Sequence, residues 1–70
     1  MRGKEFIRRV RRYARRNSVP FEWKPDRGKG SHGLLILGSR RTVIRDPKDE
    51  LKTGTFHAML KQLGLRDDEI

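Results

Sequence analysis

The chain contains no cysteine among its 70 residues. Disulfide bonds and thiolate sites are therefore excluded, which fits a reducing compartment, and we expect a cytoplasmic protein. Long apolar runs are also missing, because the longest one extends only from Leu34 to Leu37. A membrane-spanning helix needs about 20 apolar residues. The sequence therefore predicts no membrane span.

Apolar residues are scarce, at 33% of the chain. A chain of this length buries only about 60% of the surface that its unfolded form exposes, so its core must be small. No internal repeat and no long linker divides the sequence. We therefore expect residues 1–70 to form a single domain.

Acidic residues are few, with 9 against 18 basic residues and a net charge of +9. The segment from Arg2 to Arg16 holds eight basic residues and one acid, a balance of +7, which leaves +2 for the rest of the chain. A concentrated basic face is typical of proteins that bind a polyanion, either nucleic acid or an acidic protein. An arginine-rich N-terminus is also typical of transit peptides. Its removal would take away much of a small core, so we expect this segment to belong to the fold.

Residues Gly3 to Asn17 have the periodicity of an amphipathic helix. The apolar side chains on one side are Phe6, Ile7, Val10, Tyr13 and Ala14. The arginines on the other side are Arg8, Arg9, Arg11, Arg12, Arg15 and Arg16. Solvated helix faces usually mix both charge signs, whereas this face is arginine only after Glu5. We therefore favour phosphate binding over simple solvation and name Arg8, Arg11, Arg12 and Arg15 as candidate RNA contacts.

Three strands and a second helix follow. Alternation predicts strands over Val19–Lys24, His32–Leu37 and Arg40–Arg45, the last two joined by a tight turn at Gly38-Ser39. A second amphipathic helix is predicted to begin near Thr53 to Thr55, where a hydroxyl can cap the free amides, and to stop at Gly64. The tail from Arg66 to Ile70 is expected to fray.

This order predicts an α+β fold of the type α-β-β-β-α, with both helices packed on one face of a three-stranded antiparallel sheet. The middle strand is apolar on both faces, because Leu34 and Ile36 point one way while Leu35 and Leu37 point the other. One pair therefore lacks a cover within the chain. This suggests a protein partner or self-association.

The loop from Asp26 to His32 is basic and rich in glycine. Glycine lets the backbone approach a ligand closely, so Arg27, Lys29, Gly30 and Ser31 are candidate phosphate contacts. His32 follows at the start of a strand, and imidazole is the side chain best suited to proton transfer near neutral pH. His32 is therefore the candidate catalytic residue.

The residues Lys29-Gly30-Ser31-His32 look like the GSH signature of the HicA family of toxin mRNA interferases. The segment from Glu50 to Phe56, followed by Leu60 to Leu65, resembles the closing helix of that family. Many members carry a polar residue at the position of Gly33, and many have a glycine-aromatic pair at Asn17-Ser18.

The resemblance implies a fold similar to double-stranded-RNA-binding domains and the role of a toxin in a type II toxin–antitoxin system. It implies an endoribonuclease that cleaves mRNA without metal or cofactor and depends on the histidine matched by His32. It also implies a HicB-type antitoxin as partner, so we expect the chain either as a monomer or in complex with that antitoxin. The alternative is a non-catalytic RNA-binding module of the same fold.

Other candidate residues have simpler interpretations. His57 lies at the edge of the second helix's apolar face, where a boundary residue making a local hydrogen bond is the expected role. Trp23 could stack on a base, but its alternation with Phe21 favours the core. Acidic side chains form no obvious metal cluster in the sequence.

Overall fold

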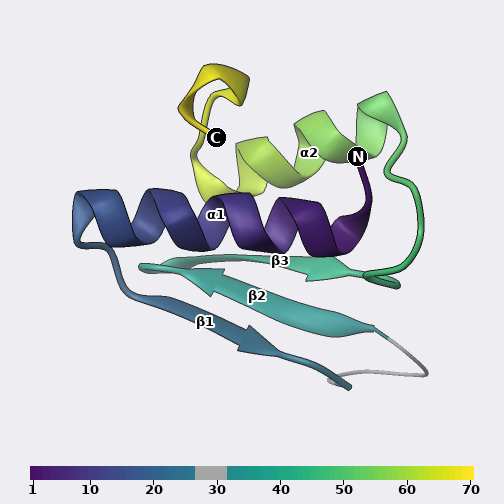
Figure 1. Ribbon diagram of the computed structural model, residues 1–70, viewed down its shortest axis with the longest axis horizontal. Helices are drawn as coiled ribbons and strands as arrows, with labels where there is room; N and C mark the ends of the chain where they lie inside the picture. Colours follow the sequence, from purple (N-terminus) through teal and green to yellow (C-terminus); the bar gives the residue numbers. More distant parts are fainter. Residues whose placement is uncertain (27–31) are drawn as a thin grey trace.

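The computed structural model describes residues 1–26 and 32–70 and has an α+β fold with the predicted order (Figure 1). The elements are α1 (Gly3–Asn17), β1 (Phe21–Lys24), β2 (Gly33–Leu37), β3 (Arg40–Ile44), α2 (Thr53–Leu63) and a 3-10 helix (Asp67–Glu69). Each strand is one or two residues shorter than predicted. Val19 and Pro20 lead into β1 without joining it, although the Pro20 carbonyl accepts a hydrogen bond from the amide of Gly38 at 2.8 Å.

The three strands form an antiparallel sheet in the order β1-β2-β3. In its register, Trp23 of β1 lies opposite Leu35 of β2, which in turn lies opposite Thr42 of β3. The tight turn between β2 and β3 has Gly38 at φ 61°, a left-handed conformation that glycine adopts without strain. Strand β2 is therefore the central strand, bonded on both sides.

Helix α1 ends at a left-handed residue, as many helices do. That residue is Ser18, at φ 54°, and the following amide of Val19 donates to the carbonyl of Ala14 at 2.9 Å. Asn17 remains helical, and its side-chain amide donates to the carbonyl of Tyr13 at 2.9 Å.

Helix α2 begins at Thr53, as predicted, but without the predicted hydroxyl cap. The residue at its N-cap is Lys52, and no side chain caps it. The stop at Gly64 is confirmed, because this residue takes φ 73° and its amide donates to Lys61. The start of helix α2 is thus stabilised by tertiary packing, and its end is stabilised by a glycine.

Both helices lie on the same face of the sheet, so the predicted two-layer arrangement is confirmed (Figure 1). The buried apolar residues that form the core are Phe6, Ile7, Val10, Ala14, Leu35, Leu37, Ile44, Met59, Leu60, Leu63 and Leu65. Phe6 and Phe56 join α1 to α2 through an edge-to-face contact with ring centroids 5.8 Å apart. Such aromatic contacts stabilise a core beyond the area that they bury.

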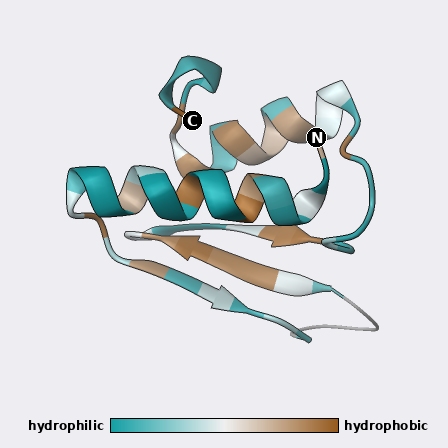
Figure 2. Ribbon diagram, viewed as in Figure 1, coloured by the Kyte–Doolittle hydropathy of each residue, from teal (hydrophilic) through white to brown (hydrophobic). Residues whose placement is uncertain are grey.

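The other face of the sheet carries no helix. Leu35 and Leu37 point to the core, whereas Leu34 and Ile36 are only half-buried and Val43 is 53% exposed. Figure 2 shows that β2 is hydrophobic over most of its length. The prediction that one apolar pair of β2 lacks a full cover is confirmed.

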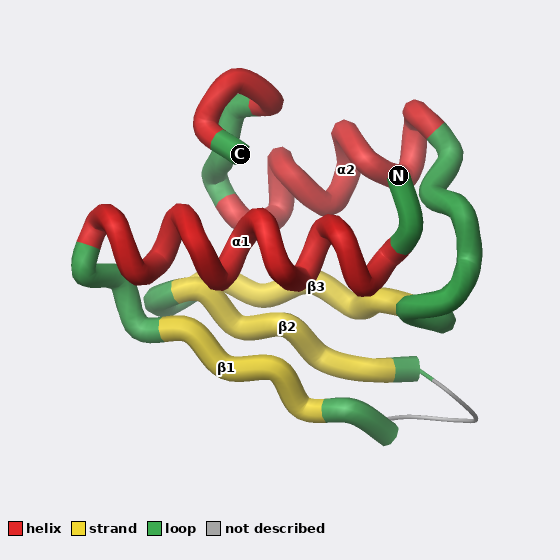
Figure 3. The backbone as a smooth tube through the Cα atoms, in the orientation of Figure 1, coloured by secondary structure: helices red, strands yellow, loops and turns green. Residues whose placement is uncertain are grey.

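The C-terminal tail is ordered, so the expectation that it frays was wrong. Residues Asp67–Glu69 form a helical turn beyond α2 (Figure 3). The amide of Arg66 donates to the carboxylate of Glu69 at 2.8 Å, and Ile70 packs against the core. A guanidinium nitrogen of Arg16 donates to the carbonyl of Glu69 at 3.1 Å, which ties the turn to α1.

Candidate functional site

The candidate catalytic histidine lies at the start of the central strand. His32 directly precedes Gly33, which is paired with Ile44 of β3. The His32 side chain is half-buried, so solvent reaches it. The strand that follows is held on both sides by hydrogen-bonded neighbours, which makes this end of β2 a rigid support for a reacting group.

The residue after His32 has no side chain because Trp23 fills the space. A Cβ atom placed on Gly33 would lie 2.1 Å from Cη2 of the Trp23 indole. Trp23 lies opposite Leu35, so Gly33 is its diagonal neighbour across the two strands. The half-buried indole therefore rests against the backbone next to His32 and also packs against the core.

Four of the predicted phosphate contacts cannot be placed. Arg27, Lys29, Gly30 and Ser31 lie outside the residues that the structure describes. Their role stays a prediction.

The first turn of α1 lies over the same end of the sheet as His32. A Cβ on Gly3 would lie 3.2 Å from Cγ2 of Ile44 and 2.9 Å from Cα of Pro47. The amide of Lys4 donates to the carbonyl of Pro47 at 2.8 Å. The fold therefore brings Lys4, the first cation of the α1 face, to the end of the molecule where β2 begins.

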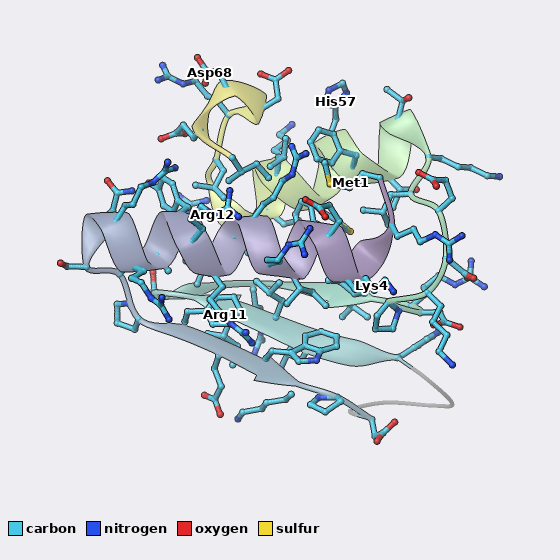
Figure 4. All side chains as sticks on the ribbon, in the orientation of Figure 1. Met1, Lys4, Arg11, Arg12, His57 and Asp68 are labelled. Carbon is cyan, nitrogen blue, oxygen red and sulfur yellow. The ribbon has the colours of Figure 1, made fainter. Side chains whose placement is uncertain are left out.

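The arginines of α1 do not form one uniform face. Arg11 lies over the ring of Phe21 in β1, with its guanidinium carbon 5.2 Å from the ring centroid. Arg12 instead lines a hollow of ≈ 290 Å³ that it shares with Asp68 and Glu69. Figure 4 shows Lys4 and Arg11 on the side of α1 that faces the sheet, and Arg12 on the side of the C-terminal turn that carries Asp68. The structure thus separates Arg12 from Arg11, although the sequence grouped them.

Glu5 lies between the two sides of α1 and pairs with arginines on both. Arg9 donates to one of its carboxylate oxygens at 2.9 Å, and Arg8 donates to the other. The hydrogen bond from Arg9 holds the pKa of Glu5 below its ordinary value, and the charges of Arg8 and Arg9 act in the same direction. The carboxylate therefore stays ionised and reduces the positive charge of both neighbours.

His57 is exposed on α2 and contacts the ring of Phe56, with centroids 5.5 Å apart. It lines a small hollow with Met1, Leu51 and Thr53. The structure therefore supports its interpretation as a boundary residue. Among the residues that the structure describes, no group of three or more His, Cys, Asp or Glu side chains is placed to hold a metal ion.

A model of one protein family, described as "HicA toxin of bacterial toxin-antitoxin", matches residues 19–65. The chain belongs to the HicA toxin family. The match covers most of the chain and includes all three strands and α2, together with His32. This HicA-family chain is therefore a toxin of a toxin–antitoxin pair, and its partner is an antitoxin.

The family match begins after α1, so it says nothing about the arginines of that helix. No curated protein and no solved structure matches this HicA-family chain. In the described part of the chain, neither helix has the length and apolar character that crossing a membrane requires.

Two features of the site were not predicted from the sequence. The first is the contact between Trp23 and Gly33, which depends on strand register. The second is the acidic lining of one side of α1 by Glu5, Asp68 and Glu69. The four-residue spacing of Glu5 and Arg9 could have indicated one of these pairs. Nothing in the sequence places Glu69 beside Arg16.

Proposed function

We propose that this toxin is a metal-independent mRNA interferase of the cytoplasm, with His32 as its general acid or base. The observation that carries the proposal is the position of His32. It is a half-buried, solvent-accessible imidazole on a rigid strand end, within the residues matched by the toxin family. A histidine sealed among the leucines of the core could not reach a substrate. We further propose that the partner antitoxin is of the HicB type.

The chemistry requires little from the protein because RNA carries its own nucleophile. Neutral His32 would accept the proton of a ribose 2′-hydroxyl. The 2′ oxygen then bonds to the adjacent phosphorus, the bond from phosphorus to the 5′ oxygen breaks, and that oxygen takes up a proton. The products are a 2′,3′-cyclic phosphate and a 5′-hydroxyl end. Lys29 and the amides near Gly30 would oppose the charge that gathers on the phosphate.

The proposal is tested with purified protein and RNA in the presence of EDTA. We expect the wild type to cut and His32→Ala to lose cleavage by about 10²-fold or more, as removal of a general base typically does. His57→Ala is the matched control, since it removes the other histidine from an exposed position, and it should cut like the wild type. Equal cutting by wild type and His32→Ala would refute the role of His32.

The same experiment distinguishes the proposed nuclease from the alternative function. If the wild type binds RNA but leaves it intact with and without EDTA, the chain is a non-catalytic RNA-binding module. If it cuts only without EDTA, metal independence is wrong while the nuclease function stands. Mapping the ends of the product supplies a further check, because a 5′-phosphate product would exclude attack by the 2′-hydroxyl.

A further inference from the structure

We propose that RNA follows only one side of α1, the side toward β1, and that the chain itself neutralises the other side. The first side is a row formed by Lys4, Arg8, Arg11 and Arg15, called here the β1-side row. The second is formed by Arg9, Arg12 and Arg16, called here the C-terminal-side row. This inference rests on the proposed function and assigns the path of the substrate.

Helix geometry divides the cations into these two rows. At 3.6 residues per turn, the members of the β1-side row fall within an arc of about 60°. Glu5 and the C-terminal-side row fall within a second arc of about 60°, centred about 100° from the first. The β1-side row extends about 16 Å along the helix from Lys4 to Arg15. It is therefore a continuous track that can contact successive phosphates.

Three of the four members of the β1-side row are available to a polyanion, and the fourth, Arg8, is paired with Glu5. Lys4, Arg11 and Arg15 are exposed, and among the residues that the structure describes none of the three forms an ion pair. Arg11 is oriented by the ring of Phe21, 5.2 Å from its guanidinium carbon, and this contact leaves the donors at the edge of the guanidinium free to bind phosphate. Figure 4 shows Lys4 and Arg11 on the same side of the helix.

Two of the three members of the C-terminal-side row, Arg9 and Arg16, already have partners within the chain. Arg9 is bonded to Glu5 at 2.9 Å, and Arg16 donates to the Glu69 carbonyl at 3.1 Å. Arg12 lies between them in the hollow that Asp68 and Glu69 also line. A phosphate entering this hollow would have to approach carboxylates and displace existing bonds, so its binding is opposed by like-charge repulsion.

Contacts within the chain hold the C-terminal turn in a defined shape. Its acidic side chains therefore stay next to the C-terminal-side row of α1. Glu69 accepts the amide of Arg66 at 2.8 Å, and the guanidinium of Arg66 lies 3.4 Å from Asp68. Ile70 packs against the core. The acidic turn is therefore anchored next to α1 instead of moving freely in solvent.

The path also leads to the candidate catalytic residue. Lys4 lies at the end of α1 that packs over Ile44, and Ile44 is paired with Gly33, the residue after His32. An RNA strand that follows the β1-side row toward Lys4 therefore arrives at the end of β2 where His32 lies. The C-terminal-side row leads to the tail instead.

The test compares two double variants that remove the same charge from the same helix. Arg11→Gln with Arg15→Gln removes two cations from the β1-side row, and Arg12→Gln with Arg16→Gln removes two cations from the C-terminal-side row. The probe is a fluorescent single-stranded RNA with 2′-O-methyl groups, which cannot be cleaved by 2′-hydroxyl attack. The affinity of each variant for this RNA is measured by fluorescence anisotropy over a series of salt concentrations. All measurements are made at a temperature below the thermal unfolding midpoint of every variant.

We expect the β1-side double variant to bind at least fivefold more weakly, with a salt slope reduced by about 1.4, which corresponds to two lost phosphate contacts. The C-terminal-side variant should stay within twofold of the wild type. Asp68→Asn should bind the same RNA more tightly, because it removes an acid that lines the hollow beside the C-terminal-side row.

Equal losses in the two double variants, or a larger loss in the C-terminal-side variant, would overturn the one-sided path while leaving the function of His32 intact. Wild-type affinity in both variants would assign these arginines of α1 to solvation or to the antitoxin and likewise overturn the inference. No binding by the wild type, together with no cleavage of unmodified RNA, would overturn both this inference and the proposed function.

Discussion

At the scale of single residues, the space beside His32 is set by Trp23. Because a Cβ on Gly33 would lie 2.1 Å from the indole, Gly33→Ala must move the ring or the strand end. We expect this variant to lose stability and cleavage together. Adding Trp23→Leu frees the space and should restore part of the cleavage lost by Gly33→Ala. No recovery in the double variant, measured with unmodified RNA, would contradict this steric reason.

Gly54, in contrast to Gly33, has room for a side chain. Apart from its chain neighbours and the backbone of its own helix, no atom of the described residues lies within 4 Å of a Cβ placed there, and the residue is in the first turn of α2. Gly54→Ala should therefore raise the free energy of unfolding by about 0.5–1 kcal/mol, because alanine loses less backbone entropy in a helix. Urea denaturation at neutral pH measures this gain, and a loss of stability would show that the site is crowded.

Glu5 makes the stability of α1 depend on pH. Its pKa is lowered in the fold, chiefly by the hydrogen bond from Arg9, so its contribution is fully present above the ordinary glutamate pKa of about 4.3. It is lost as pH falls through the lowered value. Glu5→Gln should therefore be less stable than the wild type at pH 7, and the difference should vanish in strong acid. A difference that stays constant between pH 7 and pH 2 would contradict this.

At the scale of elements, the two faces of the sheet should respond differently to truncation. Leu35 is fully buried under the helices, so Leu35→Ala should cost about 2–5 kcal/mol. Val43 is 53% exposed on the open face, and Val43→Thr should change stability by no more than about 0.5 kcal/mol. Chemical denaturation of both variants tests this, and similar losses would mean that the open face is covered.

At the scale of the whole molecule, the net charge of +9 opposes self-association, since two copies repel each other. The open sheet face adds a limited apolar surface, because Leu34 and Ile36 are half-buried. We therefore expect the free toxin to sediment as a monomer of 8.3 kDa. A dimer that Val43→Glu dissociates would show instead that this face joins two copies.

Much of the fold could be predicted because its signals are local. The alternation of Phe21 and Trp23 in β1 and the helical spacing of Phe6 and Val10 identify buried faces without knowledge of the partner elements. The ends of the helices were less predictable. The left-handed residue after α1 is Ser18, and the start of α2 has no hydroxyl cap. These choices depend on the contacts that fix the chain direction, such as the close approach of Gly3 to Pro47.

By itself, the sequence determined the order of elements, the buried faces of the two helices and the concentration of positive charge on α1, because each follows from local periodicity or residue chemistry. Only the tertiary structure decided which arginines remain available. Glu69 is 53 residues from Arg16 in the chain, and Trp23 reaches Gly33 across two strands. Contacts between segments so far apart depend on packing and strand register, which no local pattern contains.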